Sequence, residues 1–459
     1  MLDLLVKGGR IFSDGMEFEA DIGVRDGVIA VVGRGVEEPA ERVIDATGKL
    51  VIPGGIDGHT HFQMPYGETR TADDFYAGTT AAACGGVTTV IDFATPRPGQ
   101  SILEAFEERR READPRVAVD YGLHVSVTGA SKWDEGELRR LLELGVSSFK
   151  VFTAYRGRGL MMDDGGMLRF MEAAAKIGVL VGAHCENEDI IQERLRRFER
   201  EGRLTPLYHA LSRPPIAEAE AVQRLALLAQ HSEALLWVVH LSSKMGLEAI
   251  RRMRRAGARV YAETCPHYLV FTDEVYRRPD AEKFLLAPPI KGAEDREALW
   301  EGLARGEIQT LGSDHAPFNW AEKKVGREDF RKSPGGVQGT ENIIPILFSE
   351  GVRKGRISMR RLVELTSLNP AKLFGLYPRK GTIIPGADAD LTIIDPDKEV
   401  VLGRETLHSR LDHSIYEGMR VRGYPVYTIS RGEVVFEEGE ALTQPGRGRF
   451  LKRGKPIPF

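Results

Sequence analysis

The alternation of short apolar segments with longer helical stretches limits the possible folds of this chain more than any other feature. Helical stretches begin, for example, at Ile102 and Ile190. Segments with the length and composition of buried strands lie between these stretches and on either side of them. There are eight such segments: VIPGGIDGHTH, TTVIDFA, VDYGLHV, SSFKVFT, VLVGAHCE, LLWVVHLS, RVYAETCP and TLGSDHA. Strands that alternate with helices indicate parallel βα units. Eight units in one run predict an α/β protein with a (β/α)8 barrel over residues 53–375.

The two ends of the chain have a different pattern, which is typical of antiparallel β structure. An Asp-Gly pair at 26–27 lies between two alternating apolar runs, and this arrangement is a strong hairpin signal. An Arg-Gly pair at 431–432 lies between two β-rich runs near the other end. We therefore predict a small β-sandwich domain that is built from residues 1–52 and 376–440.

Composition excludes several classes of protein. Apolar residues make up 42% and charged residues 28% of the 459 positions, which is typical of a soluble globular protein. Three cysteines without a CxxC pair are too few for a disulfide framework or a cysteine zinc site. A net charge of -4 argues against a nucleic-acid partner. The last residues, 441–459, are basic and rich in Gly and Pro, and we expect a C-terminal arm on the surface.

Membrane insertion is not expected either. No segment approaches the run of about 18 apolar residues that a spanning helix needs. The beginning of the chain carries Asp3, Lys7 and Arg10, where a signal peptide would be apolar. We expect a cytoplasmic protein without a membrane partner.

Polar residues that can bind metal ions lie at the ends of the predicted strands. Catalytic groups of (β/α)8 barrels lie at the carboxyl ends of the strands, where all eight strands converge. Residues two apart in a strand point the same way, so His59 and His61 can both face the mouth of the barrel. Each residue alone has an ordinary structural explanation, but their shared position indicates one functional site. The candidates are His59, His61, Lys150, His184, His240 and Asp314.

This set of side chains favours a borderline divalent ion. Four imidazoles and one carboxylate without a thiolate suit Zn, and Mn, Co or Ni are alternatives by ligand type. The ammonium group of Lys150 would be repelled by two dications. Carbamylation by carbon dioxide would convert it into an anionic group with two oxygens, able to bridge two metals about 4 Å apart. We therefore expect two divalent ions per chain and a carbon dioxide requirement.

The segments around these residues resemble the cyclic amidohydrolases of the amidohydrolase superfamily, most closely the hydantoinase and dihydropyrimidinase branch. The resemblance extends over essentially the whole chain. It implies that His59 and His61 bind the more buried metal, that His184 and His240 bind the more exposed one, and that Lys150 is an N6-carboxylysine bridge. The most specific segments are PGGIDGHTHF, TADDFYAGTTAAACGGVTTVIDF, FKVFTAY, AHCEN, VVHLSS, GSDHAPF and NPAKLFGLYPRKGTIIPGADADL.

The resemblance also implies the activity. Such enzymes open the cyclic amide ring of hydantoins or dihydropyrimidines and release N-carbamoyl amino acids. Asp314 would bind the first metal and act as the catalytic base. Tyr155, in the FKVFTAY segment, would donate a hydrogen bond to the substrate carbonyl.

Four further positions match the substrate-binding regions of this family. Backbone groups of Ala287 and Gly335 would hold the cyclic amide ring, although D-selective hydantoinases usually have Ser and Asn there. Because backbone atoms make these contacts, ring binding should survive the two differences. Met64 and Phe152 would line the pocket for the exocyclic substituent, which makes an apolar substituent plausible.

Three other interpretations are open to different degrees. Dihydroorotase-like enzymes have a Leu-Arg pair after the HxH motif, whereas this chain has Phe62 and Gln63. An allantoinase is the main alternative, because allantoinases share the APP segment and a loop that contains GG. A non-catalytic dihydropyrimidinase-like scaffold is less favoured, because such relatives lack part of the metal set. The family implies a small-molecule substrate and a homo-oligomer, either a tetramer or a dimer.

Overall fold

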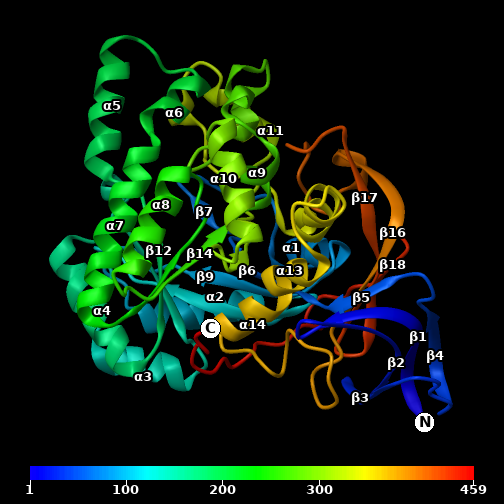
Figure 1. Ribbon diagram of the computed structural model, residues 1–459. Coiled ribbons are helices and arrows are strands. Elements are labelled where there is room, and N and C mark those ends of the chain that lie inside the picture. Colours follow the sequence, from blue (N-terminus) through cyan, green and yellow to red (C-terminus); the bar gives the residue numbers. More distant parts are fainter.

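Eight parallel strands form a barrel in the computed structural model, which describes residues 1–459 (Figure 1). The strands pair in chain order, and a bridge between Thr60 and His315 connects the last part of the barrel to the first. All eight predicted segments contribute a strand, so the predicted fold class is confirmed. The barrel strands are β6 (Gly55–Thr60), β9 (Val87–Ala94), β10 (Asp120–Ser126), β11 (Ser148–Phe152), β12 (Leu180–His184), β13 (Leu235–Val238), β14 (Val260–Thr264) and β15 (Thr310–Leu311).

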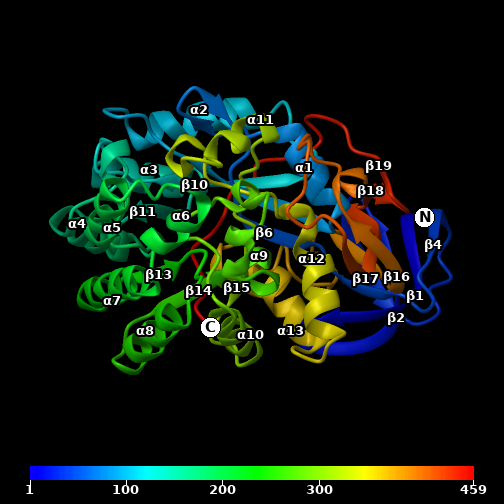
Figure 2. The ribbon, with the colours of Figure 1, turned by 90° about the horizontal axis from the view of Figure 1, so that it is seen from above.

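Helices surround the barrel, and some of them also pack against the small β domain (Figure 2). Their first turns are stabilised by local sequence, and α2 begins at a capping box in which Ser101 and Glu104 bond each other's backbone N–H groups. No helix combines the length and the apolar character needed to cross a bilayer. The helices are α1 (Phe75–Cys84), α2 (Ile102–Ala113), α3 (Glu135–Glu143), α4 (Asp164–Ile177), α5 (Glu188–Arg200), α6 (Pro206–Ser212), α7 (Pro215–Ser232), α8 (Lys244–Arg255), α9 (Pro266–Val270), α10 (Ala293–Ala304), α11 (Trp320–Lys323), α12 (Ile343–Ile346), α13 (Met359–Val363) and α14 (Asn369–Leu373).

The two ends of the chain share one nine-stranded mixed sheet, blue and orange in Figure 1. Strands β5 and β16 pair antiparallel and join the two halves. Both predicted hairpin turns are present, because the residues at 26–27 and at 431–432 have positive φ angles. The strands are β1 (Leu2–Ser13), β2 (Met16–Arg25), β3 (Val28–Gly33), β4 (Ala40–Asp45), β5 (Leu50–Pro53), β16 (Leu391–Leu402), β17 (Met419–Ser430), β18 (Glu433–Glu437) and β19 (Glu440–Ala441); a separate ribbon contains β7 (Pro65–Tyr66) and β8 (Thr69–Arg70).

The last residues of the chain lie along the end of the barrel where strands begin. The N–H of Leu451 donates to the carbonyl of Tyr121 at 2.7 Å, and the N–H of Arg453 donates to the carbonyl of Gly145 at 3.1 Å. The side chains of Leu451 and Arg453 are both buried, and the Arg453 guanidinium donates to Ser148 Oγ at 2.8 Å. The arm therefore closes the end of the barrel opposite the strand ends that carry the predicted site.

Gly375 provides a test of this arrangement, because the arm passes directly over it. Its φ angle is +72°, and an added Cβ atom would lie 1.9 Å from the carbonyl oxygen of Gly454. We expect Gly375→Ala to lower the free energy of unfolding by about 3 kcal/mol or more, because strain adds to a backbone clash. Urea titration would measure the change.

A matched control is Gly386→Ala. Gly386 also has a positive φ of +91°, but an added Cβ would meet nothing within 4 Å. Only the conformational cost of about 1 kcal/mol should then appear. Equal losses in the two variants would contradict the close packing of the arm on the barrel.

Candidate metal centre and substrate cavity

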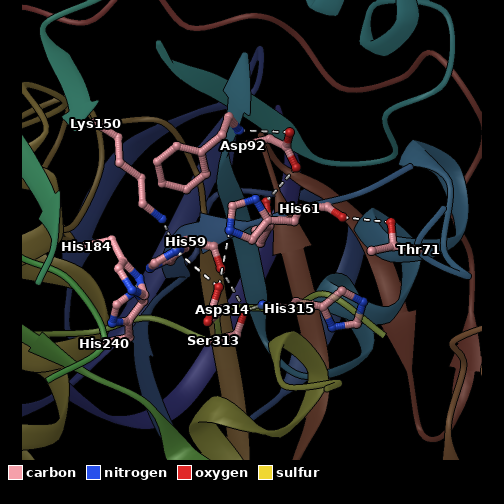
Figure 3. A network of polar contacts seen from close by, with 12 residues as sticks. His59, His61, Thr71, Asp92, Lys150, His184, His240, Ser313, Asp314 and His315 are labelled. Atoms are coloured by element: carbon pink, nitrogen blue, oxygen red, sulfur yellow. Dashed lines mark hydrogen bonds and ion pairs between the residues drawn. The ribbon is translucent and has the colours of Figure 1, made fainter. Parts of the chain in front are cut away.

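Side chains from three separate barrel strands meet around His59 (Figure 3). His59 and His61 lie at the end of β6, Lys150 lies in β11, and Asp314 follows β15. Asp314 Oδ1 is 3.2 Å from Nε2 of His59 and 3.2 Å from Nε2 of His61. Lys150 Nζ is 3.0 Å from His59 Nε2. Four of the six predicted metal-site residues therefore form one contact group.

The other two residues form a second group beside the first. His184 ends β12 and His240 follows β13, and their Nδ1 and Nε2 atoms are 2.9 Å apart. The backbone φ angle is 39° at His240 and 49° at Asp314. Left-handed backbone at residues other than glycine is uncommon and often marks functional sites. Local strain at these two positions is consistent with side chains that must point into the barrel mouth.

The donor atoms fit a metal centre. The ligand atoms of His59, His61 and Asp314 all lie within 4.8 Å of one another. Burial lowers the pKa of His59, His184 and His240 below the usual value for histidine. The imidazoles are therefore neutral near pH 7, which is the form that binds a metal.

Two buried glutamates orient these histidines, and sequence reasoning did not identify either of them. Glu263 Oε1 lies 2.6 Å from His59 Nδ1, and Glu186 Oε2 lies 2.9 Å from His184 Nε2. Carboxylates that accept from the far ring nitrogen fix the tautomer and the orientation of a ligand histidine. The only sequence signal was an acid within the segments RVYAETCP and AHCEN.

Arg213 forms an ion pair with Glu186, one of these two glutamates. Its guanidinium contacts the carboxylate of Glu186, which is almost completely buried. Burial opposes ionisation of Glu186, but Arg213 and the hydrogen bond to His184 outweigh it and hold its pKa below the usual range. The charged carboxylate is thus available to keep the His184 ring in place.

Lys150 has an environment that favours loss of its proton. Burial lowers the pKa of its amine to about 8, although Asp314 and Glu263 act in the opposite direction. Nζ also lies 4.3 Å from the ring centroid of Phe93. A larger fraction of the amine is therefore neutral near pH 7 than for an ordinary lysine, and the neutral amine is the form that reacts with carbon dioxide.

A cavity of about 390 Å³ lies above the metal-site residues. Ten of the eleven predicted site residues line it, while His59 is fully buried beneath. The structure therefore brings together side chains and loops that are distributed over most of the sequence. The ten residues are His61, Met64, Lys150, Phe152, Tyr155, His184, His240, Ala287, Asp314 and Gly335.

Tyr155 is held in the cavity wall by an unusual backbone conformation. Its φ angle is 69°, and its N–H donates to Glu188 Oε2 at 2.8 Å. The ring centroid lies 4.8 Å from that of His184. Burial raises the pKa of the hydroxyl, which therefore keeps its proton. No hydrogen bond within the chain uses this hydroxyl, so it can donate to a ligand.

The two predicted ring-binding loops also have unused hydrogen-bonding groups. Ala287 and Gly335 are partly exposed in the cavity wall, and each is flanked by buried residues. Neither their N–H nor their C=O groups take part in a backbone hydrogen bond. A peptide group that is free on one side of a cavity can bind the complementary edge of an amide.

Comparison with known proteins supports one family. The amidohydrolase family model matches residues 50–435. A D-hydantoinase from Geobacillus stearothermophilus is 43% identical over 455 residues, which cover 98% of this chain and 96% of the relative.

Solved structures agree over the same length. A crystal structure of a D-hydantoinase superimposes with a TM-score of 0.96 at 42% identity, and covers 98% of this chain and 99% of that one. The dihydropyrimidinase from Brevibacillus agri NCHU1002 superimposes with a TM-score of 0.96 at 38% identity, with the same coverage of 98% and 99%. Both the small domain and the barrel therefore have counterparts in these relatives.

Proposed function

This chain belongs to the amidohydrolase family, and from that premise we propose that it hydrolyses the cyclic amide ring of hydantoins or dihydropyrimidines to N-carbamoyl amino acids. One observation carries the proposal. Histidines, a lysine and an aspartate from separate strand ends converge beneath a cavity whose walls present free peptide groups. Relatives that match this chain over nearly their full length are named D-hydantoinase and dihydropyrimidinase.

The six metal-site residues would hold two divalent ions, with Zn as the first choice and Mn, Co or Ni as alternatives. One ion would be bound by His59, His61 and Asp314, and the other by His184 and His240. Lys150, carbamylated by carbon dioxide, would be shared between them. Such ions supply Lewis acidity and lower the pKa of bound water.

Asp314 and Tyr155 would carry out the proton movements and polarise the carbonyl group. The Asp314 carboxylate lies at the cavity floor and can accept a proton from the attacking water. The same group can then deliver that proton to the ring nitrogen as the carbon–nitrogen bond breaks. The free hydroxyl of Tyr155 would donate a hydrogen bond to the carbonyl oxygen, where negative charge develops.

Ala287 and Gly335 would hold the ring, because their peptide groups offer both donors and acceptors to a cyclic amide. The loss of Ser and Asn side chains at these positions changes no backbone group. Met64 and Phe152 line another part of the cavity and would contact an apolar exocyclic substituent. The proposal also includes a homo-oligomer of two or four chains and a cytoplasmic location.

The alternatives are less well supported. The relatives described above favour a hydantoinase or dihydropyrimidinase over an allantoinase. A non-catalytic scaffold would not need all six candidate metal ligands, and the contacts among these residues support the catalytic proposal instead.

A hydrolysis panel tests the proposed function. Enzyme expressed with divalent metal and bicarbonate is assayed with hydantoin, 5-substituted hydantoins of both hands, dihydrouracil and allantoin. We expect N-carbamoyl products from hydantoins or dihydrouracil at rates well above the rate with allantoin. Faster hydrolysis of allantoin would favour the alternative, and no hydrolysis by fully metallated enzyme would contradict the proposal.

Replacement of Lys150 tests the carbamate. We expect Lys150→Ala to lose metal and activity, because no anionic group would then connect the two binding sites. Metal content per chain and hydantoin turnover are measured together. Lys176→Ala, which removes an exposed lysine from α4, is the control and should retain both. A Lys150→Ala enzyme with two metals and full activity would rule out this role.

Tyr155→Phe tests the hydrogen bond to the carbonyl oxygen. We expect kcat to fall by about 10² to 10³, the usual cost of one lost oxyanion donor. Thermal stability should hardly change, because the hydroxyl has no partner within the chain. Tyr66→Phe removes another hydroxyl from the cavity wall and is the matched control. Similar kcat values for wild type and Tyr155→Phe would exclude Tyr155 from the mechanism.

A further inference from the structure

Lys323 is a buried cation that the proposed mechanism does not use. It is the last residue of α11, and only 1% of the residue is exposed. No carboxylate compensates its charge, and burial lowers the pKa of the amine to about 7. Isolated buried charges are costly unless hydrogen bonds satisfy them. The position therefore needs an explanation.

The hydrogen bonds of Lys323 are made only to backbone carbonyls. Nζ donates to the carbonyl of Leu285 at 2.7 Å, to that of Pro334 at 3.1 Å and to that of Gly336 at 2.9 Å. An ammonium group has three donors, so this set uses all of them.

These three carbonyls belong to the two loops that contain Ala287 and Gly335. Pro334 and Gly336 are the immediate neighbours of Gly335, and Leu285 lies two residues before Ala287. Lys323 thus binds carbonyls beside the cavity, while the peptide groups of Ala287 and Gly335 stay without internal partners. A single side chain connects both sides of the expected ring-binding site.

Other contacts connect the two loops to each other and to the segment after β15 that carries Asp314. The N–H of Gly336 donates to the carbonyl of Leu285 at 2.9 Å. A Cβ atom at Gly336, where φ is +147°, would lie 2.2 Å from the carbonyl oxygen of Ala316, two residues after Asp314. Movement of either loop would therefore change its position relative to Asp314 as well as to the other loop.

A role in stability alone does not account for a lysine at this place. Replacing a buried charge by a well-packed apolar side chain of similar volume is often neutral or stabilising. A cation with three fixed acceptors instead sets the separation and orientation of the carbonyls around it. Binding sites need their contacting groups held within a fraction of an ångström by such supporting interactions.

We propose that Lys323 is a positioning residue, which holds the two loops so that the free peptide groups of Ala287 and Gly335 face a cyclic amide ring. This inference rests on the proposed function. It predicts that replacement of Lys323 weakens substrate binding more than it slows the reaction, because Lys323 does not contact the groups that react.

The test compares Lys323→Met with Lys324→Met. Lys324 is the next residue, but it is exposed, and its amine makes no hydrogen bond or ion pair within the chain. For Lys323→Met we expect KM for hydantoin and dihydrouracil to rise about tenfold, because two ring contacts each lose a few-fold in affinity. The value of kcat should change by less than about threefold. Lys324→Met should keep wild-type values of both.

Hydrogen exchange gives a second readout that does not depend on activity. In Lys323→Met, amides of the non-proline residues in 284–290 and 333–337 should exchange faster than in the wild type. Amides of the metal-bearing strands should be unchanged, and metal content should match the wild type. Unchanged KM and unchanged loop exchange in folded, metallated Lys323→Met would overturn the inference.

A second variant covers the case in which Lys323→Met does not fold. Lys323→Gln keeps amide donors without the charge, and a raised KM with nearly normal kcat would again support positioning. If kcat falls only in proportion to the loss of folded or metallated protein, the inference is overturned. If wild-type enzyme hydrolyses no member of the panel, the proposed function fails. If wild type is active but the variants keep its KM and loop exchange, only this inference fails.

Discussion

The contacts of His59 are the point on which the rest of the site depends. Its ring lies below the cavity and is fully buried, with Glu263 of β14 on one nitrogen and Lys150 of β11 and Asp314 on the other. These contacts exist only because the parallel sheet closes and brings the ends of β6 and β15 together. Barrel closure thus produces the candidate metal site, and the burial that results keeps His59 neutral.

Burial of so many ionisable groups has a physical consequence. Lys150, Asp314, Glu186 and Glu263 are all removed from bulk water, and each needs a compensating partner. Arg213 supplies one for Glu186, and the His61 ring, with Nε2 3.2 Å from Oδ1, can donate a hydrogen bond to Asp314. In the metal-loaded enzyme, cations would compensate the carboxylates further and couple metal binding to the stability of this end of the barrel.

Much of this arrangement follows from local patterns. The turns at 26–27 and 431–432 require positive φ angles, and Gly at the second position of each makes them recognisable. Strand segments with a terminal histidine or aspartate predict convergence, because all parallel strands of a barrel end at one face. Glu263 and Lys323 were not predictable in this way. An acid within a strand and a lysine beside another lysine look ordinary until the partners, far apart in sequence, are known.

Local patterns in the sequence are enough to predict the fold class, the division of the β domain between the two chain ends, and the strand-end residues that can bind metal. Periodicity and turn chemistry act over a few residues, so they are readable without the structure. The groups that support the site become known only from the folded chain. The outer carboxylates, the burial of Arg453 and the three carbonyls around Lys323 depend on contacts between distant segments, which local sequence does not encode.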